Sequence, residues 1–528
     1  MTQAQADLWV DEHWQVRKPM VRGDGGLVAS QHYLASEIGA QVLRDGGNAI
    51  DAAVAAGMAI GTLEPWMSGL GGGGYMQVYI AAEKRVRTVD FGMISPRRLD
   101  PTAYPLTGRT RTELFVWPEV EDDRNVFGAT AMLVPGYVAG MALALESFGT
   151  RNWRDTLAPA LALASAGMPV DWYASLRIAA NARELSRYPA SAATFLPGGL
   201  PPGSEAVGPL PRLRLGRLAE TFARLAEHGP RDFYEGGIAR DIASDIEAGG
   251  GSLRADDLAA YRARLAEPLV GRYRDATVYA APELTGGPSL LEALAALARR
   301  IPVSRGGTPS TEAYLAYADI LFDVYRRRLE GMGEGEAAKA PGSTTHLTVI
   351  DRHGNMVALT QTLLSVFGSK MMLPKTGILM NNGVMWFDPR PGRPNALAPA
   401  TRPLTNMCPT LWVHDDGSRL ALGASGGRRI MPAVFQLLSF VSDYGMDLEG
   451  AFHQPRIDVS GGDTVLADPR LPTATVAALA ARHPVQPAVQ AVFPIHYACP
   501  NAVAVDALGH RTGAAYVMSP WARVATAD

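Results

Sequence analysis

A small hydroxyl residue stands at the head of a strand-like run in the middle of the chain. The run is Ser343 to Ile350 (STTHLTVI), and it follows a segment rich in glycine, glutamate and alanine, Gly331 to Gly342. A threonine hydroxyl at such a junction can attack the preceding carbonyl and break the chain before Thr344. The new N-terminal residue then carries a nucleophile and a base together, because an α-amine has a pKa of about 7.7–8.0 and accepts a proton at neutral pH.

The neighbouring sequence predicts a β-hairpin that orients Thr344. Residues 345–350 and 356–363 have the composition of strands, and residues 351–355 (DRHGN) have turn chemistry. A hairpin symmetric about His353 places position 344 opposite position 362. Directly opposed side chains in an antiparallel pair lie about 5 Å apart at Cβ. We therefore expect the Thr362 hydroxyl to bond to the Thr344 hydroxyl and to orient it.

A second candidate nucleophile lies in Gly423–Gly427 (GASGG), which matches the G-x-S-x-G pattern. A predicted strand at 419–423 and a predicted helix at 428–442 supply the strand–turn–helix context of a nucleophile elbow. Under this interpretation Ser425 is the nucleophile, and its acid and base come from a downstream set: Asp458 with His483, His496 or His510.

The same glycines have another possible use. A Gly-Gly pair at a helix N-terminus exposes backbone N–H groups and the positive end of the helix dipole. The amides of Gly426 and Gly427 can then form an oxyanion hole for a tetrahedral intermediate made by a different nucleophile. The residues alone leave both interpretations open.

Bulk composition predicts a globular enzyme with no nucleic-acid or membrane partner. The chain has 528 residues, 47% of them apolar and 19% charged, and a net charge of −3 from 49 basic and 52 acidic residues. The first twenty residues lack the apolar core of a signal peptide, and no apolar run reaches about 18 residues. We therefore expect a cytoplasmic protein. The scattered histidines and two cysteines have no metal-ligand spacing, which predicts neither a metal nor a cofactor.

The coarse pattern predicts helices packed on sheets, divided at 343/344. Strands are expected at 27–29, 75–80 and 85–91, and helices at 30–44 and 49–62, the second of them capped by Asn48. Residues 135–330 look mostly helical, and residues 344–430 look mostly β. The glycine run at 71–74 lacks a phosphate-binding signature and is interpreted as a tight turn or close backbone packing.

A set of short motifs, found here in one order, jointly resembles the gamma-glutamyltransferase family of N-terminal-nucleophile hydrolases. The motifs are Gly47–Val54, Gly69–Gly74, Thr344–His346, Asn381–Asn382, Arg402–Leu404 with Met407 and Pro409, and Gly426–Gly427.

The resemblance implies an α+β fold, a four-layer αββα sandwich. It also implies one precursor that cleaves itself between Ser343 and Thr344 into a large subunit (1–343) and a small subunit (344–528), with a dimer of such pairs possible. In this family Thr344 corresponds to the nucleophile, Thr362 to its orienting partner, and Gly426 and Gly427 to the oxyanion hole.

The departures from the family pattern concern the glutamyl head group. The family arginine that follows Asp90-Phe91 and holds the glutamate carboxylate is Gly92 here, and the acid that binds the α-amine is Trp386. The asparagine two residues after the orienting threonine is Leu364. Gly383 follows the Asn-Asn pair in place of a polar residue, and Thr405-Asn406 replaces a Ser-Ser pair. The amide chemistry looks retained, whereas the glutamyl specificity looks lost.

Arg428 and Arg429, beside the proposed oxyanion hole, are candidate ligands for a small substrate carboxylate, unless they are solvent-facing helix charges. Thr405 and Asn406 are further candidate substrate contacts. The resemblance then favours hydrolysis of a small carboxylate-bearing amide, with oxamate to oxalate and ammonia, a step of purine catabolism, as the first choice. A γ-glutamyl hydrolase or transferase, a glutaryl or cephalosporin acylase, the Ser425 hydrolase and a non-catalytic binding protein are the alternatives.

Overall fold

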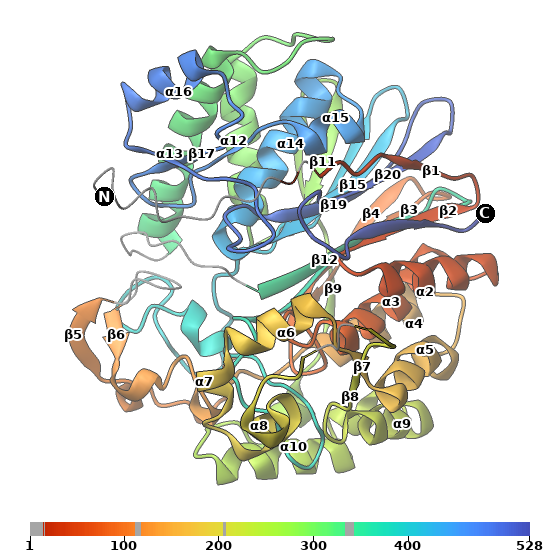
Figure 1. Cartoon of the computed structure of the whole chain (residues 1–528), viewed down its shortest axis with the longest axis vertical. Helices are drawn as coiled ribbons and strands as arrows, with labels where there is room; N and C mark the ends of the chain where they lie inside the picture. The colour runs from red at the N-terminus through yellow and green to blue at the C-terminus, as the bar shows by residue number, and fades with distance from the viewer. Residues whose placement is uncertain (1–13, 15, 111–117, 204–206, 333–342) are drawn as a thin grey trace.

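Two seven-stranded sheets stack face to face, and helices cover the outer face of each (Figure 1). This computed structural model describes residues 14, 16–110, 118–203, 207–332 and 343–528. The first sheet contains the strand that begins at Ser343. Its order is β21 (Arg523–Thr526), β2 (Gly26–Ser30), β12 (Ser343–Asp351), β13 (Met356–Leu364), β3 (Gly73–Ile80), β4 (Arg85–Phe91) and β9 (Arg264–Ala266).

The second sheet is also antiparallel throughout. Its order is β1 (Val21–Arg22), β20 (Arg511–Ala515), β19 (Cys499–Val505), β15 (Arg419–Ser425), β14 (Thr410–His414), β11 (Ala276–Ala280) and β10 (Leu269–Tyr273). In the described ranges, seven short strands form three smaller sheets outside these two: β5 (Leu106–Thr110) with β6 (Pro118–Val120), β7 (Met168–Pro169) with β8 (Arg212–Leu213), and β16 (Ile457–Asp458) with β17 (Val465–Ala467) and β18 (Val485–Pro487).

Apolar side chains on the facing surfaces join the two sheets. This inner core includes Leu27, Tyr79, Ile350, Met356 and Ala358 of the first sheet and Leu411, Ala421 and Val503 of the second. The outer face of the first sheet packs on α3 (Ala49–Leu63), of which every residue except Gly61 is buried. The outer face of the second sheet packs on α12 (Gly287–Arg300), α13 (Thr311–Met332) and α14 (Ile430–Tyr444). The four-layer αββα prediction is confirmed.

The remaining helices extend these two outer layers. They are α2 (Tyr33–Arg44), α4 (Tyr137–Phe148), α5 (Trp153–Ala166), α6 (Trp172–Ala179), α7 (Ala182–Leu185), α8 (Pro189–Phe195), α9 (Leu218–His228), α10 (Gly237–Ala248), α11 (Ala255–Ala260), α15 (Leu448–His453) and α16 (Thr473–Ala480). Within the described ranges, no helix has both the length and the apolarity needed to cross a membrane.

One broad expectation is confirmed and one needs correction. The stretch 135–330 is mostly helical, from α4 to α13, although β9, β10 and β11 also lie within it and β11 shows the period-two burial of a strand. The stretch 365–409 carries no named strand, although it was expected to be mostly β. Five prolines between 389 and 403 remove backbone donors that a sheet needs.

The predicted hairpin is confirmed in its register. His346 pairs with Thr360 and Leu347 with Leu359, which centres the hairpin on His353. The glycines at 71–74 allow β3 to approach the neighbouring backbone, as expected. A Cβ on Gly72 would lie 2.4 Å from the Thr362 carbonyl oxygen, so no side chain fits there.

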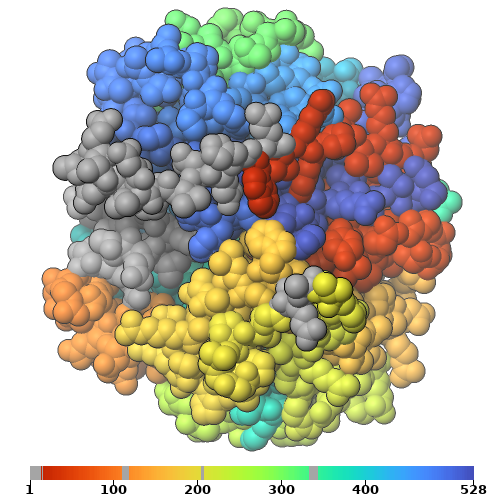
Figure 2. Space-filling model, in the orientation of Figure 1, coloured from red at the N-terminus to blue at the C-terminus, as the bar shows by residue number. Residues whose placement is uncertain are grey.

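Each sheet contains strands from both sides of the 343/344 junction. In the first sheet β2 lies between β21 and β12, and in the second sheet β1 pairs with β20. Figure 2 shows the N-terminal segment, in red, against the C-terminal segments, in blue, on one face of the molecule. Breaking the chain at this junction would therefore leave two fragments that share both sheets.

The Asp351 carboxylate ties the turn of the hairpin to helix α3. It is 1% exposed and accepts hydrogen bonds from the amides of Ala49, His353 and Asn355 and from the Asn355 side chain. We predict that Asp351→Ala lowers the free energy of unfolding by about 2–4 kcal/mol, because several buried donors lose their acceptor.

Urea denaturation measures this change. Asp506→Ala is the matched control, because Asp506 accepts from Leu508 and His510 in a similar but exposed turn. Its loss should cost less than about 1 kcal/mol. Equal losses in the two variants would contradict a special role for the buried turn.

Candidate active site

Thr344 lies at a β-bulge at the start of β12. The register shifts between Ser343, which pairs with Leu364, and Thr345, which pairs with Gln361. The extra residue frees Thr344 from the regular ladder, a local irregularity that is common beside active sites. Thr344 is 4% exposed, and its side chain lies on the inner face between the two sheets, together with Thr362.

One hydroxyl connects the predicted nucleophile to the carbonyl that precedes it. The Thr344 hydroxyl donates to Thr362 Oγ1 over 3.2 Å, and the Thr362 hydroxyl donates to the Ser343 carbonyl oxygen. The backbone amide of Leu364 donates to the same Thr362 oxygen over 2.9 Å. Thr362 is therefore held in one orientation, with its hydroxyl hydrogen directed at the carbonyl oxygen of the Ser343–Thr344 peptide bond.

The backbone next to Thr362 is strained. Leu364 has φ +83°, in the left-handed region that a branched side chain rarely adopts. The strained residue is the same one whose amide donates to the Thr362 hydroxyl.

Gly426 and Gly427 lie where the second sheet meets the head of β12. A Cβ on Gly423, three residues before Gly426, would lie 2.2 Å from the ring of His346, two residues after Thr344. Gly426 has φ +136° and Gly427 φ +64°, so both positions favour glycine. Within the described part of the chain, neither amide donates a hydrogen bond. Both amides are therefore unpaired in the described ranges, and their role as an oxyanion hole stays a prediction.

His346 supports this junction and does not act as a base. Its Nδ1 bonds to the Thr360 hydroxyl over 2.8 Å, and its ring is fully buried against Gly423. Burial lowers the pKa of His346 to about 3, so the ring is neutral at physiological pH.

Arg428 and Arg429 are not solvent-facing. Their side chains are buried, at 7% and 5% exposure, and Arg429 donates to the Ile495 carbonyl over 2.5 Å. Burial lowers the pKa of Arg428 to about 10, and its carbonyl accepts from the Tyr325 hydroxyl. Both guanidinium groups are buried close to Gly427 in the chain. Their role as ligands of a substrate carboxylate stays a prediction.

Thr405 and Asn406 differ in their hydrogen bonding to the rest of the protein. The Thr405 side chain and amide both bond to the Leu284 carbonyl, and its own carbonyl accepts from the buried Arg328. Thr405 is thus a fixed structural residue. Asn406 is half-buried, and its side chain has no partner in the described ranges, which leaves it available to a ligand.

The residues that replace the family's polar contacts are apolar in their packing as well as in type. Leu364 and Trp386 belong to one buried hydrophobic cluster that also contains Tyr75, Met93 and Met407. A free α-ammonium placed there would lose its water without gaining a carboxylate partner, which costs roughly 1–3 kcal/mol or more.

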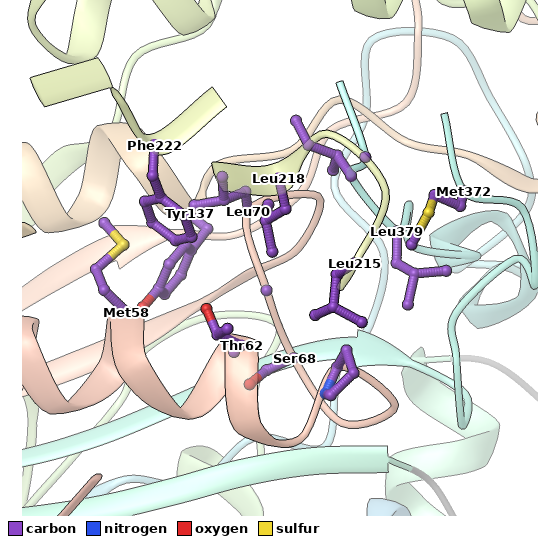
Figure 3. Close-up of a pocket in the computed structure, with 15 residues that line it drawn as sticks. Met58, Thr62, Ser68, Leu70, Tyr137, Leu215, Leu218, Phe222, Met372 and Leu379 are labelled. Atoms are coloured by element: carbon purple, nitrogen blue, oxygen red, sulfur yellow. The ribbon is translucent and has the colours of Figure 1, made fainter. Parts of the chain in front are cut away.

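A hydroxyl network behind β12 was not predicted. Ser68 donates to the Thr345 hydroxyl over 2.9 Å and accepts from Gln361 Nε2 over 2.9 Å. Ser68 also lines a cavity of about 20 Å³ on the helical side of the first sheet. Figure 3 shows this cavity with the hydroxyls of Thr62, Ser68 and Tyr137 among apolar side chains. It has room for about one water molecule, so it is not a substrate site.

Two of the three histidines proposed to serve Ser425 bond to other residues. Ser425 is the last residue of β15 and is 1% exposed. His483 bonds to Asp319 over 2.9 Å, and His510 bonds to Asp506 over 2.9 Å. Asp458 accepts a hydrogen bond from Ser460. Neither of these two histidines is oriented toward Ser425.

The model of the family described as Gamma-glutamyltranspeptidase matches residues 35–341 and 323–493. The chain belongs to this family. Acylase ACY 1 proenzyme from Pseudomonas sp. (strain SE83) is 33% identical over 500 residues, which cover 88% of each chain. Glutathione hydrolase proenzyme from Bacillus subtilis (strain 168) is 31% identical over 487 residues, which cover 82% of this chain and 81% of that one.

The fold of this family member also matches a solved structure. The crystal structure of cephalosporin acylase from Bacillus halodurans aligns with a TM-score of 0.82 over 98% of both chains, at 24% sequence identity. That likeness supports the αββα fold. The relatives are enzymes, and the prediction that this chain is an enzyme is confirmed.

We predict that Thr362→Val lowers the rate of cleavage before Thr344 by about 100-fold to 1,000-fold, because the variant keeps the shape and loses the donor to the Ser343 carbonyl. The rate is followed on a denaturing gel after synthesis of the protein in a cell-free system. Thr362→Ser keeps the hydroxyl and should cleave within about tenfold of the wild-type rate. Wild-type cleavage in the valine variant would exclude this role.

Proposed function

We propose that the chain is a precursor that cleaves itself before Thr344 and then hydrolyses a small amide through an N-terminal Thr344 acyl-enzyme. The observation that carries the proposal is the position of the Thr362 hydroxyl, which accepts from the Thr344 hydroxyl and donates to the Ser343 carbonyl. The precursor names of the relatives support self-cleavage.

Cleavage begins when Thr344 Oγ1 attacks the Ser343 carbonyl carbon. Thr362 donates to the carbonyl oxygen as negative charge develops there, and the hydroxyl proton of Thr344 moves to the Thr344 nitrogen as the C–N bond breaks. The product is an ester between Ser343 and Thr344. Water hydrolyses the ester, which frees the Ser343 carboxylate and the Thr344 α-amine.

Turnover reuses the same groups on a substrate amide. The α-amine of Thr344 takes the hydroxyl proton, and Oγ1 attacks the amide carbonyl. The amides of Gly426 and Gly427 stabilise the oxyanion, and the protonated amine then gives its proton to the leaving nitrogen. Water attacks the acyl-enzyme, with the amine again as base, and releases the acid.

The two fragments, 1–343 and 344–528, are proposed to stay together as large and small subunits, because their strands pair with one another in both sheets. A dimer of such pairs and a cytoplasmic location are further predictions from the sequence.

The proposed substrate is a small amide whose acyl group carries a carboxylate and no α-ammonium. Leu364 and Trp386 in an apolar cluster disfavour a glutamyl head group. Oxamate, the choice made from the sequence, requires Arg428 or Arg429 near the oxyanion hole to bind its carboxylate. Glutaryl amides of the acylase type are the second candidate, supported by the likeness to acylases. Ammonia or amine release across oxamate, glutamine, glutathione and glutaryl amides separates them.

A pair of alanine variants tests the nucleophile. Thr344→Ala should stay as one band at 56.3 kDa on a denaturing gel and show no turnover, because it lacks the attacking oxygen. Ser425→Ala, the matched control, should give two bands in proportion to 1–343 and 344–528. Normal cleavage of Thr344→Ala, or loss of cleavage only in Ser425→Ala, would favour the alternative nucleophile.

If the Thr344 α-amine is the general base, kcat/KM depends on pH. Because the α-amine must be unprotonated to accept the hydroxyl proton, kcat/KM should fall about tenfold per pH unit below about pH 7.7. His346 does not titrate in this range, since its pKa is lowered to about 3. A stopped-time assay across about pH 6 to 9 measures this fall in kcat/KM on the acidic side of the profile. A flat profile would argue against the α-amine as base.

A further inference from the structure

Arg456 is a buried arginine whose guanidinium bonds to no carboxylate in the described ranges. The residue directly precedes β16 and is 2% exposed, which places it among the largest fully buried side chains. Its Nη2 donates to the Ala498 carbonyl oxygen over 3.3 Å, whereas its Nε and Nη1 have no acceptor in the part of the chain that the structure describes. A buried charge without an acid lowers stability, so a side chain of this kind is a candidate for a role in function.

Two tyrosine rings surround the guanidinium in place of an acid. The Arg456 guanidinium carbon lies 5.8 Å from the centroid of the Tyr497 ring and 5.7 Å from that of Tyr516. Burial raises the pKa of both tyrosines, so neither hydroxyl carries a negative charge at neutral pH. The rings therefore stabilise the cation through their faces and fix its position.

Two acids act on this cluster and bond to other groups. Asp468 pairs with Arg470 over 2.6 Å, and Asp458 accepts a hydrogen bond from the Ser460 hydroxyl. The charges of both acids and of Arg456 act on Tyr497, so the electrostatic field here is mixed. What distinguishes Arg456 is the carbonyl to which it bonds.

That carbonyl belongs to the residue against which Gly426 lies. A Cβ on Gly426 would lie 2.9 Å from Ala498 Cα and 3.2 Å from Ala498 Cβ. Ala498 directly precedes β19, whose first residue, Cys499, pairs with Ser425. The backbone at Gly426 can approach this segment no further, so the position of Ala498 limits where the Gly426 amide lies.

A second arginine bonds to the other end of the same segment. Arg429, which is 5% exposed, donates to the Ile495 carbonyl oxygen over 2.5 Å. Arg429 follows the glycine pair in the chain, whereas Arg456 comes from the separate segment before β16. Two bonds from buried guanidinium groups to carbonyls thus hold residues 495–498, the segment behind Gly426.

We infer that Arg456 is a positioning residue for turnover, which acts through Ala498 to keep the Gly426 and Gly427 amides directed at the oxyanion. This inference rests on the proposed function, in which these two amides stabilise the tetrahedral intermediate. Donors stabilise a developing charge well only when they are fixed in advance, and a displacement of about 1 Å can lower a rate by about 100-fold.

Self-cleavage provides a readout that general damage to the fold would not spare. In the proposed cleavage step the Thr362 hydroxyl is the donor to the Ser343 carbonyl oxygen, and the glycine amides take no part. Loss of Arg456 should therefore slow turnover and leave cleavage before Thr344 unchanged. Disruption of the fold would slow both.

The test compares two arginines of one cluster. Arg456→Met keeps the apolar stem and removes the guanidinium, and Arg456→Lys keeps a donor for the Ala498 carbonyl. Arg470→Met is the matched control, because Arg470 pairs with Asp468 beside the same tyrosines. Cleavage is followed on a denaturing gel. Values of kcat and KM are measured with whichever of oxamate, glutamine, glutathione and glutaryl amide the wild type hydrolyses fastest.

Arg456→Met should lower kcat by about 30-fold to 100-fold and leave KM and the cleavage rate within about threefold of wild type, because oxyanion donors act in the transition state. Arg456→Lys should recover kcat to within about fivefold, and Arg470→Met should keep the wild-type kcat within about twofold.

A second variant covers the case in which Arg456→Met does not fold. Ala498→Gly removes only the methyl group that lies against Gly426. It should lower kcat by about threefold to tenfold with unchanged KM and cleavage rate, and its effect should be less than additive with that of Arg456→Lys, since both act through one contact.

Four results would overturn the positioning role: wild-type kcat in Arg456→Met or, where that variant does not fold, in Ala498→Gly; an equal fall in kcat and in the cleavage rate; a rise in KM alone; or an effect of Arg470→Met as large as that of Arg456→Met. Failure of the wild type to cleave itself before Thr344 would instead overturn the proposed function.

Discussion

The pairing of β12 with β13 is the constraint on which the candidate site depends. One register places the Thr362 hydroxyl between the Thr344 hydroxyl and the Ser343 carbonyl. A slip by one residue would turn Thr362 to the helical side of the sheet, because side chains alternate between faces along a strand. The buried Asp351 turn at the other end of the hairpin and the backbone contact between Gly72 and the Thr362 carbonyl both hold this register.

The candidate site combines groups from both sheets. The first sheet contributes the hydroxyls of Thr344 and Thr362, and the second contributes Gly426 and Gly427, which directly follow β15. Contact between Gly423 and the His346 ring brings the two contributions together. The space between the sheets is largely apolar, so the hydroxyl and amide donors there face little competition from water, which strengthens them for charge stabilisation.

Local chemistry in the sequence was sufficient to predict the hairpin. Turn residues at 351–355 set its centre, and the Asn48 cap set the start of α3. Contacts between distant segments were not predictable in this way. Arg402 and Gly92 are 310 residues apart, and neither shows from its neighbours that the one fills the space of the other. Arg428 and Arg429 were expected either at a ligand or in solvent, and only the packing of α13 and α14 shows that they are buried.

Intact-mass spectrometry of the purified wild-type protein tests the central claim most directly. Self-cleavage predicts two polypeptides whose masses add up to the precursor plus one water, with the smaller beginning Thr344-Thr345-His346. A single mass of the full chain in protein that hydrolyses its substrate would contradict the account, because Thr344 would then have no free α-amine to act as the base.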